Sequence, residues 1–352
     1  MCRGVDDADP MTGVQATWIR TLASHPDVEH VDVFARYMGA VELPDNVTVR
    51  TFGRVRTRRA KFVRELLQLP RPWPDVFLVT QGGPWILLLL PFKLVARRRT
   101  YHWLAQPVLS RSTRASIALA DSAVFTATAG SLPPLRKTVH VIGHGIDVDR
   151  FRPAAATASD AAPRDIVVAG RIAPGKGVHQ MVLAFRRATE HHGLDCRLDI
   201  IGVSGRANRE YKDQLDATIA DLGLAERVRF LGAVPYDEMP RVIGGYRLAL
   251  NFSTTALDKA VVEAMAVGVP VLATNECVRE ILPSDLADQL VVDAYDLDAQ
   301  ARTMSALVAL DGDERSQLAR RLRSIAVEGH SVEHLFDEMV RTIRSDGARA
   351  RR

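Results

Sequence analysis

The chain has 352 residues, of which 47% are hydrophobic and 25% charged, a balance typical of globular proteins and a length that favours two domains. Its cysteines, Cys2, Cys196 and Cys277, lie far apart and lack metal-site spacing, which argues against a zinc module or a disulfide-stabilised secreted domain. The first ten residues are polar and acidic, so we expect no signal peptide and a cytoplasmic location.

The charge is distributed unevenly along the chain. Residues 50–114 contain 14 Lys and Arg but only two acids, Glu65 and Asp75, whereas the net charge of the whole chain is +4. Such a region attracts phosphates or an anionic membrane leaflet. Apolar residues at helical spacing within 54–69 fit either an interfacial membrane helix or a buried-side helix with a solvated basic face. We expect residues 50–114 to favour peripheral contact with the inner face of a membrane, and we expect no nucleic-acid partner.

The first half of the chain alternates between helix and strand. A helix is predicted over 14–23, and the strand patterns that follow lie at 31–37, 75–82, 100–106, 120–128 and 138–147. The apolar run 84–96 contains Pro91 and Lys93 and is too short to span a bilayer, so we predict a buried helix there. A doubly wound domain begins with a strand, but this chain leads from a loop into a helix, so the first strand is missing from the pattern.

The second half alternates more regularly. Strand patterns occur at 165–170, 198–205, 228–234, 248–253 and 270–274, with helical patterns between them. This alternation predicts parallel sheets with right-handed crossovers, which bind ligands at the carboxyl ends of their strands. We predict a first domain over 1–150, an Ala/Pro/Ser-rich linker over 151–164 and a second domain over 165–328. Residues 329–352 would form a helix that returns to the first domain, followed by a basic tail.

The segment "VVAGRIAPGKGVHQ" combines a strand end, a short loop and a helix start. Two cations, Arg171 and Lys176, flank that loop close to the free amides of the helix. Such amides and cations converge on anions, and a diphosphate suits an Arg fork and a Lys point charge. The spacing differs from that of a Walker A loop. A surface turn with two ordinary basic residues is the alternative reading.

The segment "STTALDKAVVEAMAVGVPV" predicts a helix over 258–268 that is apolar apart from its first turns. Lys259 and Glu263 are four residues apart and share one face, and Thr255 precedes the helix. A buried carboxylate requires partners, or its pKa rises. The partner of Glu263 is either Lys259 or two vicinal hydroxyls of a ligand.

Several of these motifs resemble the retaining family 4 glycosyltransferases. The segments "GRIAPGKG", "IIGVSG", "VRFLGAVP" and "VVEAMAVGVPVLAT" resemble the donor-binding domain, and "VIGHGIDVDRF" resembles the segment that closes the first domain. The resemblance implies the GT-B fold, an α/β architecture of two Rossmann-like domains with parallel sheets facing across a cleft. It also implies transfer of a sugar, with retention of configuration, from a nucleoside-diphosphate sugar to a glycan, lipid-linked or phosphorylated acceptor.

The resemblance assigns roles to individual residues. Arg171 and Lys176 match the pair that grips the donor diphosphate, and Gly13 matches a first-domain loop that approaches the donor phosphates. Glu263 matches the second carboxylate of an E-x7-E motif, which holds the ribose. Thr255 stands where relatives have the first Glu, which contacts the transferred sugar, so this chain departs from the family pattern.

The remaining donor and acceptor roles are also implied by the resemblance. The amides of Leu257, Asp258 and Lys259 would meet the diphosphate, and Asp258 would also contact the sugar. His102 or Gln106, in "YHWLAQPV", would be the acceptor-side catalytic residue. The alternative reading of His102 is a packed strand residue.

Metal and cofactor sites are not expected. Three D-x-D pairs, at 147–149, 296–298 and 311–313, do not follow strand ends near the donor motifs. Cations and helix amides could neutralise the leaving diphosphate instead. Two other functions stay open: a sugar-nucleotide epimerase of the same architecture, and a non-catalytic nucleotide-sugar-binding homologue weakened by Thr255.

Overall fold

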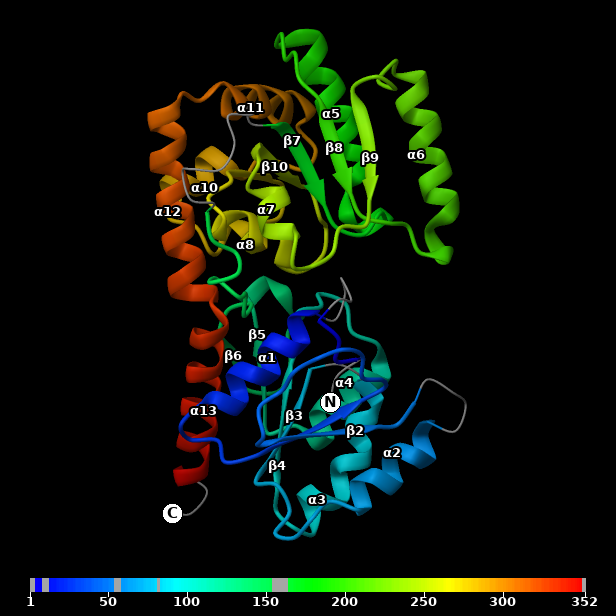
Figure 1. The fold of residues 1–352 in the computed structure, drawn as a ribbon, viewed down its shortest axis with the longest axis vertical. Helices are drawn as coiled ribbons and strands as arrows, with labels where there is room; N and C mark the ends of the chain where they lie inside the picture. Colours follow the sequence, from blue (N-terminus) through cyan, green and yellow to red (C-terminus); the bar gives the residue numbers. More distant parts are fainter. Residues whose placement is uncertain (1–3, 8–12, 54–57, 81–82, 154–163, 350–352) are drawn as a thin grey trace. The chain divides into compact units, whose positions relative to one another are not determined.

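The computed structural model divides into two compact units, which are described separately below (Figure 1). Unit 1 comprises Met1–Asp147 and His330–Arg352, and unit 2 comprises Val148–Gly329. The structure describes residues 4–7, 13–53, 58–80, 83–153 and 164–349. Most of the predicted linker and the end of the predicted basic tail, residues 154–163 and 350–352, therefore lie outside the described residues.

Unit 2 is built on a five-stranded parallel sheet with the order β11-β10-β7-β8-β9. The strands are β7 (Arg164–Ala169), β8 (Leu198–Ile201), β9 (Val228–Gly232), β10 (Tyr246–Asn251) and β11 (Val271–Ala273). The helices are α5 (Val178–His191), α6 (Arg209–Asp221), α7 (Met239–Ile243), α8 (Lys259–Ala266), α9 (Glu276–Arg279), α10 (Ser284–Leu290), α11 (Leu297–Ala309) and α12 (Gly312–His330). The strand β8 is wholly buried, and β10 is buried except at Arg247, although Asp199 and Asn251 stand among their apolar residues.

The helical predictions for unit 2 are confirmed where the apolar spacing is regular. In α5, Val178, Met181, Val182 and Phe185 occupy successive turns, and all four are buried against the sheet. The helix α6 ends two residues before Gly223, whose φ of +66° is a left-handed conformation that favours glycine.

The described strands of unit 1 fall into two parallel sheets. One sheet pairs β1 (Val31–Ala35) with β2 (Val47–Thr51). The other has the order β3-β4-β5-β6, with strands β3 (Val76–Val79), β4 (Arg99–Trp103), β5 (Ala123–Thr126) and β6 (Val139–Val141). The α-helices are α1 (Gly13–Ser24), α2 (Arg58–Leu67), α3 (Leu90–Leu94), α4 (Arg111–Ala120) and α13 (Val332–Arg349). The sequence patterns identified each of these strands except β2.

The apolar run at 84–96 does not form the single α-helix that we predicted. A 3-10 helix, η1 (Gly83–Leu89), is followed by the short helix α3. Pro91 stands in the first turn of α3, where its missing N–H and fixed φ are tolerated, so the proline separates the two helical segments. Ile86, Leu89 and Phe92 are buried, which agrees with the predicted burial.

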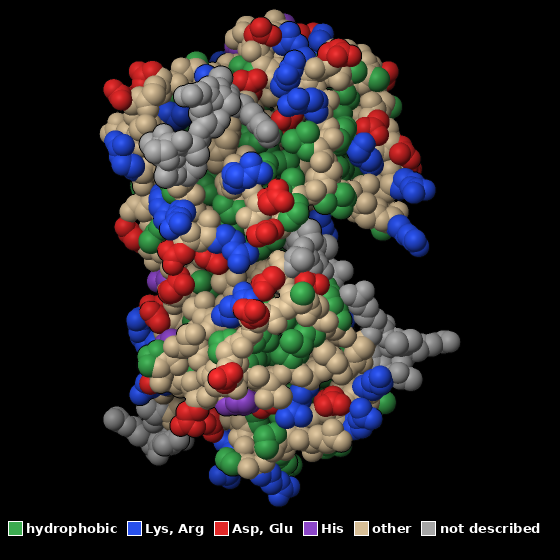
Figure 2. Space-filling view, in the orientation of Figure 1, with side chains coloured by type: hydrophobic (Ala, Val, Ile, Leu, Met, Phe, Trp, Pro, Cys, Tyr) green, Lys and Arg blue, Asp and Glu red, His purple; other side chains and the backbone are tan. Residues whose placement is uncertain are grey.

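The basic helix α2 packs into unit 1 through its apolar side. Phe62, Leu66 and Leu69 are buried in one core cluster, so the structure matches a buried-side helix with a solvated basic face. Figure 2 shows acidic and basic side chains interspersed on the visible face rather than gathered in one continuous basic patch. Within the described residues, no helix combines the length and apolarity that crossing a membrane requires.

The C-terminal helix α13 packs against α1 and the four-stranded sheet of unit 1. Leu335, Phe336 and Met339 share a core cluster with Trp18 and Phe125. The indole N–H of Trp18 donates to the Gly145 carbonyl at 2.8 Å. The end of the chain thus completes the core of the unit that contains its beginning.

Candidate functional site

The site in unit 2 lies where the strand order of the sheet reverses. From β7 the chain proceeds to β8 and β9 on one side of the sheet, and it then crosses over to form β10 and β11 on the other. The loops that leave the carboxyl ends of β7 and β10 therefore run to opposite sides. Such a switch point opens a crevice that typically binds ligands in α/β proteins.

The loop after β7 is shaped by a glycine. Gly177, directly before α5, has a φ of +67°, and a Cβ added there would lie 2.2 Å from the Phe252 carbonyl oxygen. Any larger residue would therefore push this loop away from the loop after β10. Arg171, at the start of the same loop, is exposed and makes no hydrogen bond or ion pair with the described part of the chain.

Hydrogen bonds connect the loops that follow three strands. The Gly175 carbonyl accepts from the Thr254 amide and the Ser253 hydroxyl, both at 3.2 Å. The Asn275 side-chain amide, after β11, donates to the Ser253 carbonyl at 2.8 Å and the Thr255 carbonyl at 2.6 Å. The exposed Thr255 side chain also shares a 2.7 Å hydrogen bond with the Ser253 hydroxyl. These contacts hold Thr255 beside the loop of Gly175.

Lys176 and Asp258 form an ion pair between the loops after β7 and β10. The Asp258 carboxylate also accepts from the Asn251 side-chain amide at 3.2 Å and caps α8 through the Ala260 amide at 3.4 Å. Burial alone would raise the pKa of Asp258, but Lys176 and these hydrogen bonds bring it below the usual value. Asp258 is therefore ionised at neutral pH and neutralises Lys176.

Glu263 and Lys259 form a second ion pair, one helical turn apart on α8. Their oxygen and nitrogen atoms are 2.9 Å apart, and the Glu263 side chain is only 4% exposed. Burial raises the pKa of Glu263, although Lys259 and a hydrogen bond with Tyr236 counter the shift. The Lys259 ammonium also lies 4.3 Å from the centre of the Tyr236 ring.

Among the described residues, these contacts leave Arg171 without a carboxylate partner and give Lys176 and Lys259 one each. Arg171 is available to an anion directly, whereas Lys176 and Lys259 already have carboxylate partners. A polyanionic ligand would therefore bind Arg171 and compete with Asp258 for Lys176. The buried Glu263 carboxylate can accept hydrogen bonds from hydroxyl groups, since the pair with Lys259 uses only part of its capacity.

The structure also describes Leu257 and Gly13, two further residues that were predicted to belong to the donor site. Leu257 is buried, so its backbone rather than its side chain is the part that can meet a ligand. Gly13 begins α1 in unit 1, and residues 8–12 of the predicted phosphate-approaching loop lie outside the described residues.

The two acceptor-side candidates differ in accessibility. Gln106 is exposed in the loop that follows the carboxyl end of β4. His102, within β4, is wholly buried, and its Nδ1 lies 3.5 Å from Oδ2 of the equally buried Asp121. Burial raises the pKa of Asp121, which His102 opposes. The structure thus places His102 in the interior of unit 1 as a packed strand residue, with its ring closed to solvent.

Aspartates in two of the D-x-D segments serve helix ends or ion pairs. Asp296 caps α11 through the Ala299 amide at 2.8 Å, and Asp298 binds Arg187 at 2.5 Å. Asp311 accepts from the Glu314 amide at 2.9 Å, in the first turn of α12. No cluster of three or more potential metal ligands occurs within the described ranges.

Sequence reasoning missed three side chains of the site. Asn251 and Asn275 connect the loops, and Tyr236 packs against the Lys259–Glu263 pair. The signal for the two asparagines was available, because each ends or follows an apolar strand, in "LALN" and "VLATN". Tyr236 carried no comparable signal in its loop.

A comparison with protein families decides the classification. Residues 150–325, half of the chain and nearly all of unit 2, match the family described as "Glycosyl transferases group 1". The chain belongs to the glycosyl transferases group 1 family. The matched region includes the site formed by Arg171, Lys176, Asp258 and Glu263.

Curated proteins match the chain over part of their length. The Escherichia coli (strain K12) protein named "Putative colanic acid biosynthesis glycosyltransferase WcaL" is 29% identical over 213 residues, covering 58% of this chain and 49% of that protein. The D-inositol 3-phosphate glycosyltransferase of Nocardia farcinica (strain IFM 10152) is 31% identical over 215 residues, covering 58% and 47%. The chain thus spans about half the length of the curated relatives it matches.

Solved structures resemble nearly the whole chain. Anabaena HepE in complex with UDP-glucose has a TM-score of 0.74 at 18% identity, covering 97% of this chain and 99% of that chain. Sucrose-phosphate synthase from Thermosynechococcus elongatus has a TM-score of 0.75 at 16% identity, covering 99% and 96%. At these identities the likeness establishes the fold, which is the GT-B fold expected from the sequence.

Proposed function

We propose that this group 1 family member is a glycosyltransferase that moves a sugar from a nucleoside-diphosphate sugar to an acceptor. The observation that carries the proposal is the placement of Arg171, Lys176 and Glu263 at the switch point of the unit 2 sheet, inside the region that matches the family. Cations for a diphosphate and a carboxylate for vicinal hydroxyls are the two groups that a nucleotide requires there.

The donor would bind to the second domain, residues 165–328. Arg171 and Lys176 would hold the diphosphate together with the amides of Leu257, Asp258 and Lys259 at the start of α8. Glu263 would accept from the ribose, and Thr255 and the Asp258 side chain would meet the sugar. HepE, which has the same fold, is described in complex with UDP-glucose, so UDP-sugars are the first donors to test.

The reaction would proceed with retention of configuration and without a metal ion or cofactor. The bond from the anomeric carbon to the diphosphate oxygen breaks as the bond to the acceptor oxygen forms on the same face. The departing phosphate oxygen takes the acceptor proton, and Arg171, Lys176 and the α8 amides stabilise its charge. Turnover that is unchanged in EDTA and a product with the donor's anomeric configuration are the expected results.

The acceptor would bind to the first domain, residues 1–150, where Gln106 is the accessible catalytic candidate. The excess of Lys and Arg in residues 50–114 supports an acceptor that is phosphorylated or carried on a lipid. The expected result is binding to anionic vesicles at low salt that is lost at high salt. Absence of vesicle binding, with equal turnover of uncharged soluble acceptors, would rule this acceptor class out.

One experiment separates the proposed enzyme from its alternatives. We would screen nucleoside diphosphates and their sugars by thermal shift and then incubate each binder with the protein. A transferase slowly hydrolyses its donor, so that free nucleoside diphosphate accumulates. An epimerase alters the sugar but releases no nucleoside diphosphate. A non-catalytic homologue, the reading that Thr255 favours, binds the donor and does neither.

A further inference from the structure

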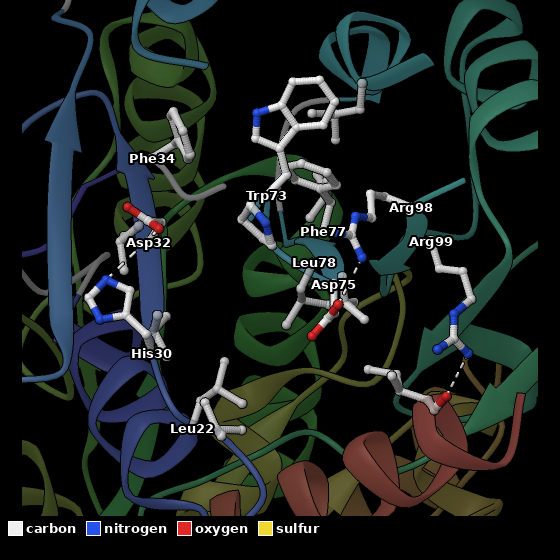
Figure 3. Close-up of a pocket in the computed structure, with 18 of the residues that line it drawn as sticks. Leu22, His30, Asp32, Phe34, Trp73, Asp75, Phe77, Leu78, Arg98 and Arg99 are labelled. Atoms are coloured by element: carbon white, nitrogen blue, oxygen red, sulfur yellow. Dashed lines mark hydrogen bonds and ion pairs between the residues drawn. The ribbon is translucent and has the colours of Figure 1, made fainter. Parts of the chain in front are cut away.

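The loops that lead into β3 and β4 lie side by side in unit 1. They comprise residues 68–75 and 95–98, and the strands that they enter are parallel neighbours. The Arg98 guanidinium pairs with the Asp75 carboxylate at 2.8 Å across the two loops, as Figure 3 shows. Residues of both loops also line the same cavity. The two loops therefore form one surface, at the amino ends of the strands.

The short helix α3 ends in two exposed apolar residues at this surface. Leu94 and Val95 are 74% and 81% exposed, whereas Phe92 of the same helix is buried in a core cluster of unit 1. The helix is thus fixed in place while its last residues stay outside, at one extremity of unit 1 (Figure 1). Single exposed apolar residues are common on protein surfaces. Two adjacent ones on an anchored helix indicate instead a surface that contacts a partner.

Trp73, in the loop before β3, adds an aromatic ring to the same surface. The ring is half-buried and packs against that of Phe92, with 4.9 Å between the ring centroids. The Arg71 guanidinium lies 5.2 Å from the centre of the tryptophan ring. Tryptophan is enriched at the boundary between lipid and water, because its ring is largely apolar but carries an N–H donor.

Two arginines supply positive charge beside these apolar groups. Arg71 and Arg97 are exposed, and no carboxylate pairs with either in the part of the chain that the structure describes. Arg97 has a φ of 53°, a left-handed conformation that is uncommon outside glycine and that often marks a functional position. An arginine can lay its apolar stem along a lipid surface while its guanidinium binds a phosphate.

We propose that Arg71, Trp73, Leu94, Val95 and Arg97 form a docking patch for the headgroup region of an anionic lipid bilayer. Leu94 and Val95 would enter the boundary between headgroups and acyl chains, and Trp73 would lie at that boundary. The two arginines would bind lipid phosphates. This proposal rests on the contact with anionic vesicles proposed above and deepens it by naming the surface that makes the contact.

The docking patch is separate from the proposed acceptor site. It lies at the amino ends of β3 and β4, whereas Gln106 follows the carboxyl end of β4. A strand of five residues such as β4 places about 17 Å between these ends. Loss of the patch should therefore weaken membrane binding without changing donor hydrolysis in solution.

The test measures binding of the full chain to sedimented vesicles of mixed phosphatidylglycerol and phosphatidylcholine. Val95→Ser should lower the partition coefficient about fivefold, and its combination with Leu94→Ser should lower it more than about tenfold. Val108→Ser is the matched control. Val108 is a valine with 84% exposure, but it lies in the loop after the carboxyl end of β4. We expect this control to bind as the wild type does.

The arginines provide a second arm that depends on charge. Arg71→Gln and Arg97→Gln should each lower binding to the mixed vesicles about fivefold at low salt. Their effect should shrink at high salt, and neither should change binding to vesicles of phosphatidylcholine alone. Arg114→Gln, at an exposed position on α4, controls for the loss of one positive charge and should bind as the wild type does.

The variants should keep the wild-type melting temperature, because the substituted side chains are exposed. If the wild type binds the mixed vesicles and the patch variants bind them equally tightly, the patch is refuted while the proposed vesicle contact stands. Loss of binding in Val108→Ser instead would assign the contact to the opposite end of β4 and overturn the patch. A patch variant that loses a dimer rather than vesicle binding would identify an interface between copies, which also refutes the proposal.

Discussion

Lys176 and Asp258 form an ion pair between the loops that follow the neighbouring strands β7 and β10, although they are 82 positions apart in the sequence. The carboxylate that caps α8 thus neutralises a cation that the proposed donor diphosphate needs. In the proposed complex the diphosphate would compete with Asp258 for the Lys176 ammonium.

Asp258→Asn should strengthen binding of a nucleoside diphosphate. Asparagine keeps the helix cap but releases Lys176, and a partly exposed ion pair is worth about 1 kcal/mol, so Kd should fall about fivefold. The gain should be smaller for a nucleotide sugar if Asp258 contacts the sugar. Calorimetric titration measures both. Asp285→Asn, which breaks a surface pair with Arg321, is the matched control. Weaker diphosphate binding by the Asp258 variant would contradict this competition and show that Asp258 positions Lys176 for the ligand.

Arg171→Ala should weaken nucleoside-diphosphate binding without destabilising the fold. The side chain is exposed and has no protein partner within the described chain, whereas a charged hydrogen bond to phosphate contributes about 1.5 to 3 kcal/mol. We expect Kd to rise by about tenfold or more, with an unchanged melting temperature. Arg320→Ala, on the exposed side of α12, controls for the loss of one positive charge. Equal affinities in the two variants would remove Arg171 from the site.

Glu263→Gln should weaken binding through the ribose. Glutamine has nearly the same shape but is a poorer acceptor than a carboxylate, so UDP should lose more affinity than its 2′-deoxy analogue. The raised pKa of Glu263 adds a pH signature. Because the folded state binds this proton more tightly than the unfolded state, the wild type should gain stability relative to the variant as pH falls from neutral towards 4.5. Melting temperatures across this range test the sign, and a constant difference would contradict it.

Thr255→Glu should change the choice of donor sugar. The substitution restores a carboxylate where the family resemblance expects one, at an exposed position beside the loop of Gly175. A charged acceptor there would favour sugars whose hydroxyls can donate to it. Hydrolysis rates of a panel of nucleotide sugars provide the measurement, with Thr254→Glu as the neighbouring exposed control. Unchanged rate and selectivity would mean that Thr255 does not line the sugar site.

His330, at the junction of α12 and α13, should make the protein sensitive to acid. Burial, followed by the charges of His144 and His334, lowers the pKa of His330 from 6.5 to about 4. The unfolded chain therefore binds the proton first, and stability should be lost as pH falls from 6.5 to about 4, by about 3 kcal/mol. His330→Gln should show a shallower loss in thermal melts across this window, whereas His192→Gln, on the surface, should follow the wild type. Parallel profiles for all three proteins would refute the assignment.

The regular elements of this protein could be predicted because their signals are local. The helix α5 follows from apolar residues at helical spacing, and the strands of unit 2 follow from short apolar runs ending at polar or glycine-containing loops. The apolar run at 84–96 was predicted less well, because Pro91 divides it into two helical segments. The strand β2 was missed, because the alternation of Val47 and Val49 with polar residues covers only five positions.

Part of the candidate site could also be predicted, because its signals are local in the sequence. Arg171, Lys176 and Glu263 each stand in a local motif, so sequence alone could nominate them and could pair Glu263 with Lys259 four residues away. The pair of Lys176 with Asp258 joins residues 82 positions apart, and no local pattern indicates such a contact.

Tertiary structure alone determined accessibility and the joining of distant segments. The family resemblance offered both His102 and Gln106, with Gln106 the better match, and the fold buries His102 but leaves Gln106 exposed. The fold likewise joins the loops after β7, β10 and β11, which are far apart in the sequence, through hydrogen bonds of Ser253 and Asn275. The physical reason is that spacing along a chain determines which face of an element a residue occupies. Which elements then meet depends on how the whole chain buries its apolar surface.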